Sequence, residues 1–292
     1  MKVIQPGKTF IILTILCFCL TGCFSTQQMI ADSAGGLFGK LALSANRQSD
    51  LTLVRQGLPA YLMLIDGLIG TNPENQDLLL AGAQAYSSYA SLLEEEESSR
   101  APQLIQKAKV YALRALEQNP LFKGASENPL DLFQMQMDKA EKSQASFLFG
   151  VGSIWGTWIA QGPDSVEGMA DLPKVEALMD RVLKLDPGYY YGGPHLFKGI
   201  MLSARPVQYG GNLEKALTHF QQALKYSQGK FLMTQIFFAQ YYAKQRLDRD
   251  LFVKTLNQVL STPADIEPDL TLINTLAHDK AKRLLNQVDE FF

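Results

Sequence analysis

The chain has 292 residues, of which 47% are hydrophobic and 19% charged, and its formal net charge is −2 at pH 7. A chain of this length and composition can bury a hydrophobic core of its own. Because it has no excess of basic residues to attract phosphate backbones, we expect no nucleic acid as a partner.

The first residues have the pattern of a bacterial lipoprotein signal peptide. Lys2 and Lys8 give a positively charged stretch before an apolar run at residues 10–20, and Leu20-Thr21-Gly22-Cys23 forms a lipobox. The run is shorter than the roughly 20 apolar residues that span a bilayer. We therefore predict that residues 1–22 are cleaved off and that Cys23 is lipidated. Two or three acyl chains would form a stable membrane anchor.

The three cysteines, Cys17, Cys19 and Cys23, all lie in this N-terminal region. Cleavage would remove two of them and lipidation would consume the third, so the mature chain is expected to have neither a free thiol nor a disulfide. Cysteine nucleophiles and thiolate metal sites are thereby excluded. Phe24 takes the place of the aspartate that commonly retains lipoproteins in the inner membrane of enteric bacteria. We expect a periplasm-facing protein anchored in the outer membrane.

The rest of the chain has the composition of an all-α protein. Ala, Leu, Gln and Tyr are frequent, alternating runs of β-branched residues are few, and apolar residues recur every three or four positions. Residues 23–28 are expected to form the lipidated start and a short linker, and residues 29–292 a single domain. The predicted helices span residues 29–44, 51–69, 76–95, 102–118, 130–162 with an interruption, 172–185, 194–204, 213–226, 231–244, 249–260 and 268–292.

Small and aromatic residues recur at the offsets of a tetratricopeptide (TPR) repeat, where paired helices cross and a proline ends the second helix. In three units along the chain they are Ala83, Tyr86, Ala108, Ala112, Ala115 and Pro120; Gly199, Ala216, Phe220 and Ala223; and Ala239, Tyr242, Leu251 and Pro263. The turns at residues 94–100 and 205–211 are longer than usual. We predict an all-α, TPR-like helical repeat array, as an α-solenoid or a compact helical bundle, with degenerate repeats and enlarged turns.

Several segments in the second half of the chain occur in a characteristic order behind the lipobox. They are Trp155-Gly156-Thr157-Trp158, Asp171-Leu172-Pro173, residues 181–186, Tyr191-Gly192-Gly193-Pro194-His195, Ala204-Arg205-Pro206, Gly210-Gly211-Asn212, His219-Phe220, Tyr241-Tyr242-Ala243 and Asn274-Thr275-Leu276-Ala277. Through these segments the region from Leu172 to the C-terminus resembles the TatT family, the tetratricopeptide lipoproteins associated with tripartite ATP-independent periplasmic (TRAP) transporters.

The resemblance implies an accessory protein of a TRAP-type solute transport system. It implies a periplasmic solute-binding protein as partner, attachment to the membrane through the lipid anchor, and homo-oligomers such as trimers. It also implies that a small hydrophobic or carboxylate ligand passes between the envelope and the binding protein. Which ligand this would be is not encoded in any of the quoted segments.

The segment Tyr189 to His195 joins three tyrosines to a flexible turn just before a helix. In one interpretation Tyr191 and His195 line a cleft for a small organic ligand, since such sites are largely apolar with a few polar groups. In the other, the segment is a junction in which glycine permits positive φ, Pro194 begins the helix and the tyrosines pack between repeats. Neither is preferred from the sequence.

Arg205 and Tyr209 lie on the enlarged turn of the second unit and are further candidate ligand-binding residues. The arginine could clamp a carboxylate through two hydrogen bonds, or it could bond the carbonyl groups at the end of the preceding helix, which we favour.

Trp155 and Trp158 lie three residues apart, on one helix face. They are candidates for a ligand platform, although aromatic side chains of this size more often fill a helical core.

The markers of an enzyme are missing from the sequence. His195, His219 and His278 are isolated, and no nucleophile elbow or phosphate-binding loop occurs. We therefore expect a non-enzymatic protein without catalytic residues, metal or cofactor. The alternative function is a generic TPR scaffold lipoprotein that organises envelope assembly complexes and binds no ligand. A ligand-binding protein should contain a partly apolar tunnel lined by several repeats, whereas a scaffold should have a solid core.

Overall fold

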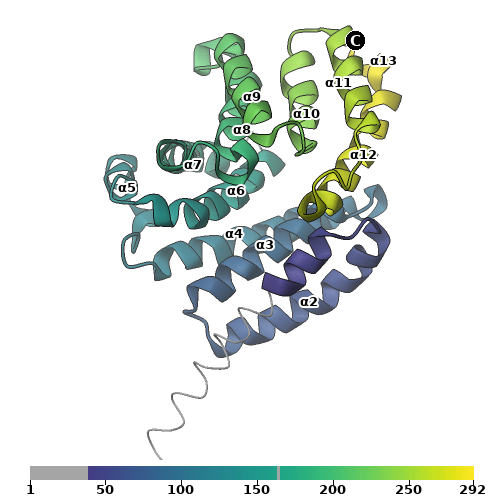
Figure 1. Ribbon diagram of the computed structural model, residues 1–292. Helices are drawn as coiled ribbons and strands as arrows, with labels where there is room; N and C mark the ends of the chain where they lie inside the picture. The colour runs from purple at the N-terminus through teal and green to yellow at the C-terminus, as the bar shows by residue number, and fades with distance from the viewer. Residues whose placement is uncertain (1–38, 163–164) are drawn as a thin grey trace, which may run out of the picture. The chain divides into compact units, whose positions relative to one another are not determined.

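The fold is seen in a computed structural model, which describes residues 39–162 and 165–292 (Figure 1). By internal contacts the chain divides into Met1–Ala42 and Leu43–Phe292, and the second unit is the one described below. The signal peptide and Cys23 lie outside the described residues. Within those residues all regular structure is helical, which confirms the predicted all-α helical repeat fold.

The helices follow one another with short connections. The α-helices are α2 (Leu51–Thr71), α3 (Gln76–Leu92), α4 (Ala101–Gln118), α5 (Leu130–Met137), α6 (Ala145–Gln161), α7 (Val166–Leu185), α8 (Tyr189–Ala204), α9 (Leu213–Ser227), α10 (Met233–Phe237), α11 (Arg249–Ser261), α12 (Thr271–Asn286) and α13 (Val288–Phe291). Short 3₁₀-helices are η1 (Glu95–Arg100), η2 (Ala125–Glu127), η3 (Lys142–Gln144), η4 (Val207–Tyr209) and η6 (Pro268–Leu270), and η5 (Phe238–Ala243) is a π-helix.

Five helices begin at a residue whose side chain caps them. In each case the capping oxygen accepts a hydrogen bond from the backbone N–H three residues further on, which satisfies a donor that the helix itself leaves free. The capping residues of α2, α3, α7, α9 and α11 are Asp50, Asn75, Ser165, Asn212 and Asp248.

Neighbouring helices pack in pairs, with the closest association between α3 and α4, α8 and α9, and α6 and α7. The small residues predicted at crossings allow this. A Cβ on Gly199 would lie 3.0 Å from the ring of Phe220, so glycine at residue 199 favours the close approach of α8 and α9. Ala108 and Ala112 of α4 are fully buried. The last long helix, α12, also contacts α2, and Arg47 Nε lies 2.6 Å from Asp269 Oδ1 beside that contact.

The structure locates two expected helices more closely. The interruption expected within residues 130–162 lies between α5 and α6, where a capping box between Glu141 and Gln144 starts η3 directly before α6. The helix expected at residues 172–185 begins six residues earlier, where Ser165 caps α7.

Two further predictions expected one continuous α-helix where the structure has more than one type of helix. The segment expected as one helix at residues 231–244 consists of the short α-helix α10 followed by the π-helix η5. The helix expected at residues 268–292 is divided into η6, α12 and α13. A π-turn inserts one extra residue into the hydrogen-bond ladder, which side-chain periodicity does not reveal.

Candidate functional site

The start of α8 has an unusual backbone. Tyr190 (φ 45°), Tyr191 (φ 58°) and Gly192 (φ 79°) occupy the left-handed region one after another. Glycine adopts it freely, and at residue 192 it is also needed for space, because a Cβ there would lie 2.9 Å from the Cα of Ala223 in α9. A bulky residue held at positive φ costs about 1–3 kcal/mol, and such residues concentrate at functional sites.

These strained residues form part of an aromatic cluster, which we define as Phe149, Tyr189, Tyr190, Tyr191 and Phe231. Tyr190 lies at its centre: its ring centroid is 5.6 Å from those of Phe149 and Phe231. Tyr191 stacks on Phe231 at 5.8 Å. Phe231 is buried, whereas Tyr190 is 47% exposed. The cluster therefore packs α6, α8 and the α9–α10 connection together and leaves Tyr190 partly exposed.

His195 faces away from the cluster, toward α9. Its Nδ1 lies 3.0 Å from Nδ1 of His219, and its ring stacks on Tyr226 at 5.7 Å. Two facing ring nitrogens can share only one hydrogen, so one imidazole donates and the other accepts. Burial, and secondarily the nearby His219, lowers the pKa of His195 to about 4. Burial followed by the Lys198 ammonium lowers the pKa of His219.

This pair predicts a pH-dependent stability. Between pH 6.5 and about 4 the unfolded chain binds a proton at His195 that the folded chain does not. Stability therefore falls as the pH is lowered through this window, by about 1–2 kcal/mol for a partly exposed group. Urea unfolding at pH 7 and pH 4.5 measures the loss. The His195→Phe variant should lose less than the wild type over the same interval, and an equal loss in both proteins would contradict the assignment.

Arg205 has an anionic partner within the chain. Its Nη1 lies 2.8 Å from Glu176 Oε1 of α7, and both side chains are 24% exposed. A ligand carboxylate would have to compete with Glu176 for the guanidinium. Tyr209, on the same turn, is largely exposed and lies in η4. The two residues thus lie on one turn but have different surroundings.

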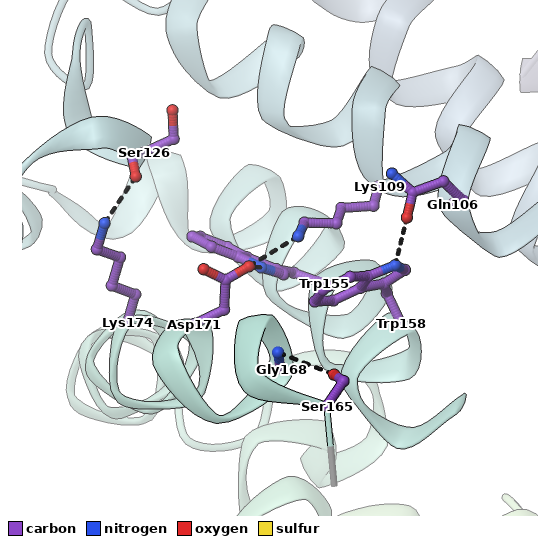
Figure 2. A network of polar contacts seen from close by, with 9 residues as sticks. All are labelled: Gln106, Lys109, Ser126, Trp155, Trp158, Ser165, Gly168, Asp171 and Lys174. Carbon is purple, nitrogen blue, oxygen red and sulfur yellow. Dashed lines mark hydrogen bonds and ion pairs between the residues drawn. The ribbon is translucent and has the colours of Figure 1, made fainter. Parts of the chain in front are cut away.

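The two tryptophans take part in a polar network between α4, α6 and α7 (Figure 2). The indole N–H of Trp155, which is buried, donates to Asp171 Oδ2 at 2.8 Å. The same oxygen lies 2.7 Å from Lys109 Nζ, and this ammonium stands 3.2 Å from the ring centroid of Trp158. The indole N–H of Trp158 donates to Gln106. Each polar group that these tryptophans bring into the interior has a partner in the chain.

Sequence reasoning missed Lys109, Glu176 and the pairing of His195 with His219. Asp171 was noticed only as part of a family-like segment. These residues are 16 to 62 positions from their partners, so no local motif marks the pairs. Asp171, which follows the two tryptophans in the sequence, could have indicated the contact with Trp155, because a buried indole N–H requires an acceptor.

The candidate residues do not surround one cavity. Tyr191 contacts Phe231, His195 contacts α9, Arg205 contacts α7 and the tryptophans contact α4 and α7. An open hollow of about 510 Å³ lies elsewhere, lined by Arg47, Ser49, Ala264, Asp265, Pro268 and Thr271. Among the described residues, no three His, Cys, Asp or Glu side chains are grouped to hold a metal ion.

Taken together, the fold and these contacts define an all-α helical repeat protein. In the part of the chain that the structure describes, no helix is long and apolar enough to cross a membrane. The model of the family described as TRAP transporter T-component matches residues 47–292, and the chain belongs to this family. Its members are accessory components of a transporter and no known class of enzyme.

A relative is found in a spirochaete. The chain is 24% identical over 266 residues to an uncharacterised protein of Treponema pallidum (strain Nichols), an alignment that covers 84% of this chain and 81% of the relative.

Proposed function

We propose that this protein is a periplasm-facing lipoprotein, anchored through Cys23, that binds the solute-binding protein of a TRAP transporter. The observation that carries the proposal is the family match over residues 47–292, which places the chain in a transporter system. The lipobox supports export and anchoring. Assembly as a homo-oligomer such as a trimer, and an outer-membrane location, belong to the same proposal.

The aromatic cluster is the best-supported ligand site. Tyr190 is half exposed although three other rings lie within 6 Å of its own, and its backbone is held in a costly conformation. Sites for small ligands combine apolar rings with a few polar groups, and here the tyrosine hydroxyls supply the polar groups. A small, largely hydrophobic ligand fits this cluster better than it fits the Arg205 turn, where Glu176 already occupies the guanidinium.

Co-purification tests the partner. The full-length chain, expressed together with its transporter and extracted in mild detergent, should retain the solute-binding protein. Recovery without any binding protein, under conditions where the transporter is produced, would count against the proposed role. In the same preparations Tyr190→Ala should weaken ligand binding by about two- to tenfold, the value of one aromatic contact. The control is Val166→Ala, which alters an exposed side chain outside the cluster.

A generic scaffold role remains the second candidate, and one observation favours it. Arg205, His195 and Trp155 all have polar partners within the chain, as expected if they only hold helices together. In that case the detergent extract should contain envelope assembly factors in place of the solute-binding protein, and Tyr190→Ala should affect no ligand.

A further inference from the structure

Lys280 of α12 is a half-buried cation without an acidic partner. Its ammonium lies 5.2 Å from the ring centroid of Phe237 in α10, and it forms no ion pair or hydrogen bond with the residues that the structure describes. Burial, and secondarily the guanidinium of Arg283, lowers the pKa of Lys280 below its usual range. The charged group that acts on this ammonium is therefore a second cation.

Other half-buried cations of the chain are compensated. Lys109, Lys198 and Arg205 have side chains that are 13%, 20% and 24% exposed, and each lies within 2.8 Å of a carboxylate oxygen. Removing an ammonium from water without a counter-charge is unfavourable, and such groups concentrate at functional sites. The ring of Phe237 attracts the Lys280 ammonium but gives its three N–H donors no oxygen. An anion from outside the chain would supply both the charge and the acceptor.

The surroundings of Lys280 follow from the packing of α10 and α12, which lie side by side (Figure 1). Asn274 Oδ1 accepts a hydrogen bond of 3.0 Å from Leu232 N–H just before α10, and further along both helices Lys280 meets Phe237. The two helices therefore run in the same direction along this contact. One turn beyond Lys280, Arg283 is exposed, so this end of the contact adjoins solvent.

Tyr241 supplies a second unused polar group at the same place. Its ring centroid is 6.1 Å from that of Phe237, four residues earlier, and its hydroxyl forms no hydrogen bond within the described part of the chain. Burial raises the pKa of Tyr241, so the hydroxyl keeps its proton and can donate. Tyr241 belongs to η5, a π-helix, and π-turns occur frequently at functional sites. An ammonium and a hydroxyl thus both lie beside Phe237 without an acceptor.

We propose that Lys280 and Tyr241 bind the carboxylate of a small organic acid, whose apolar part lies against Phe237. The two oxygens of a carboxylate can accept from the ammonium and the hydroxyl together. One half-buried cation beside aromatic rings suits a monoanion with an apolar body, because ligand sites are largely apolar with a few polar groups. Arg283 attracts the anion from solvent. The site shares no residue with the aromatic cluster, and it does not depend on the proposed transport partner.

Calorimetric titration of the full-length chain in nonionic detergent tests this site. Phenylacetate is the probe, and phenylacetamide has the same apolar body without the charge. The chain should bind phenylacetate about ten times more tightly than phenylacetamide, the value of a hydrogen bond to a charged group. Lys280→Met, which keeps the length of the side chain, should remove this preference, and Tyr241→Phe should reduce it about threefold. Lys282→Met, at an exposed lysine of the same helix, should leave it unchanged.

A second readout needs no substitution. Acetic anhydride acetylates lysines, and mass spectrometry gives the extent at each position. Phenylacetate should protect Lys280 several-fold and Lys282 not at all, whereas phenylacetamide should protect neither. Equal acetylation of Lys280 with and without phenylacetate, or equal phenylacetate affinity of the wild type and Lys280→Met, would overturn the proposal. Tyr190→Ala should keep the wild-type affinity, and a tenfold loss there would assign the carboxylate to the aromatic cluster and also overturn it.

Discussion

Replacing Asp171 with alanine is expected to destabilise the folded chain by about 2–4 kcal/mol, the effect of removing one partner from a largely buried ion pair. The variant leaves the Lys109 ammonium, whose side chain is 13% exposed, without its carboxylate and the Trp155 indole N–H without its acceptor. Urea unfolding followed by circular dichroism measures the loss. Asp171→Asn should lie between the wild type and the alanine variant, because the amide oxygen still accepts from the indole.

An exposed ion pair provides the control. Asp289 lies 2.9 Å from Arg249, but both side chains are mostly in solvent, so Asp289→Ala should change the urea midpoint very little. A further variant tests the origin of the loss: Lys109→Met combined with Asp171→Leu should be more stable than Asp171→Ala, since no unpaired charge remains. If Asp171→Ala and Asp289→Ala unfold at the same urea concentration, the network in Figure 2 contributes no more than a surface pair.

The second large effect is expected at the turn between α8 and α9. A Cβ on Gly211 would lie 1.9 Å from the carbonyl oxygen of Arg205, so Gly211→Ala forces the turn apart. Opening it breaks the hydrogen bond from Asn212 N–H to the Leu202 carbonyl, which is 2.9 Å long. We expect a loss of about 2–4 kcal/mol, in the range of strongly destabilising single substitutions.

Hydrogen exchange should locate this damage. Amides at the end of α8 and the start of α9 should exchange faster in Gly211→Ala, while those of α3 and α4 change less. Gly162→Ala is the matched substitution, because its Cβ would be 3.7 Å from Ser165 Cβ, an ordinary contact. Equal stability of the two alanine variants would mean that the turn relaxes without cost. Accelerated exchange near Arg205 would also test whether its pairing with Glu176 depends on the turn.

The extent to which the site was predictable differs between its parts. The candidate segment at Tyr191 and His195 was recognised from its composition, but its left-handed backbone and the role of Tyr190 were not. A run of tyrosines predicts neither the backbone φ of these residues nor which ring is exposed. Both depend on the close packing of α9 against Gly192. For Arg205 the expected partners were carbonyl groups, whereas the structure provides the carboxylate of Glu176. The ligand roles of Tyr191, His195, Arg205, Tyr209, Trp155 and Trp158 stay predictions.

The sequence by itself determined that the chain is an all-α repeat array with small residues at its helix crossings. Periodicity, caps and turn residues act within about one or two helical turns, and that information is local. Only the tertiary structure decided that Lys109 meets Asp171, that His195 meets His219 and that Lys280 meets Phe237. These pairings join helices far apart in the chain, and their geometry follows from how the helices pack.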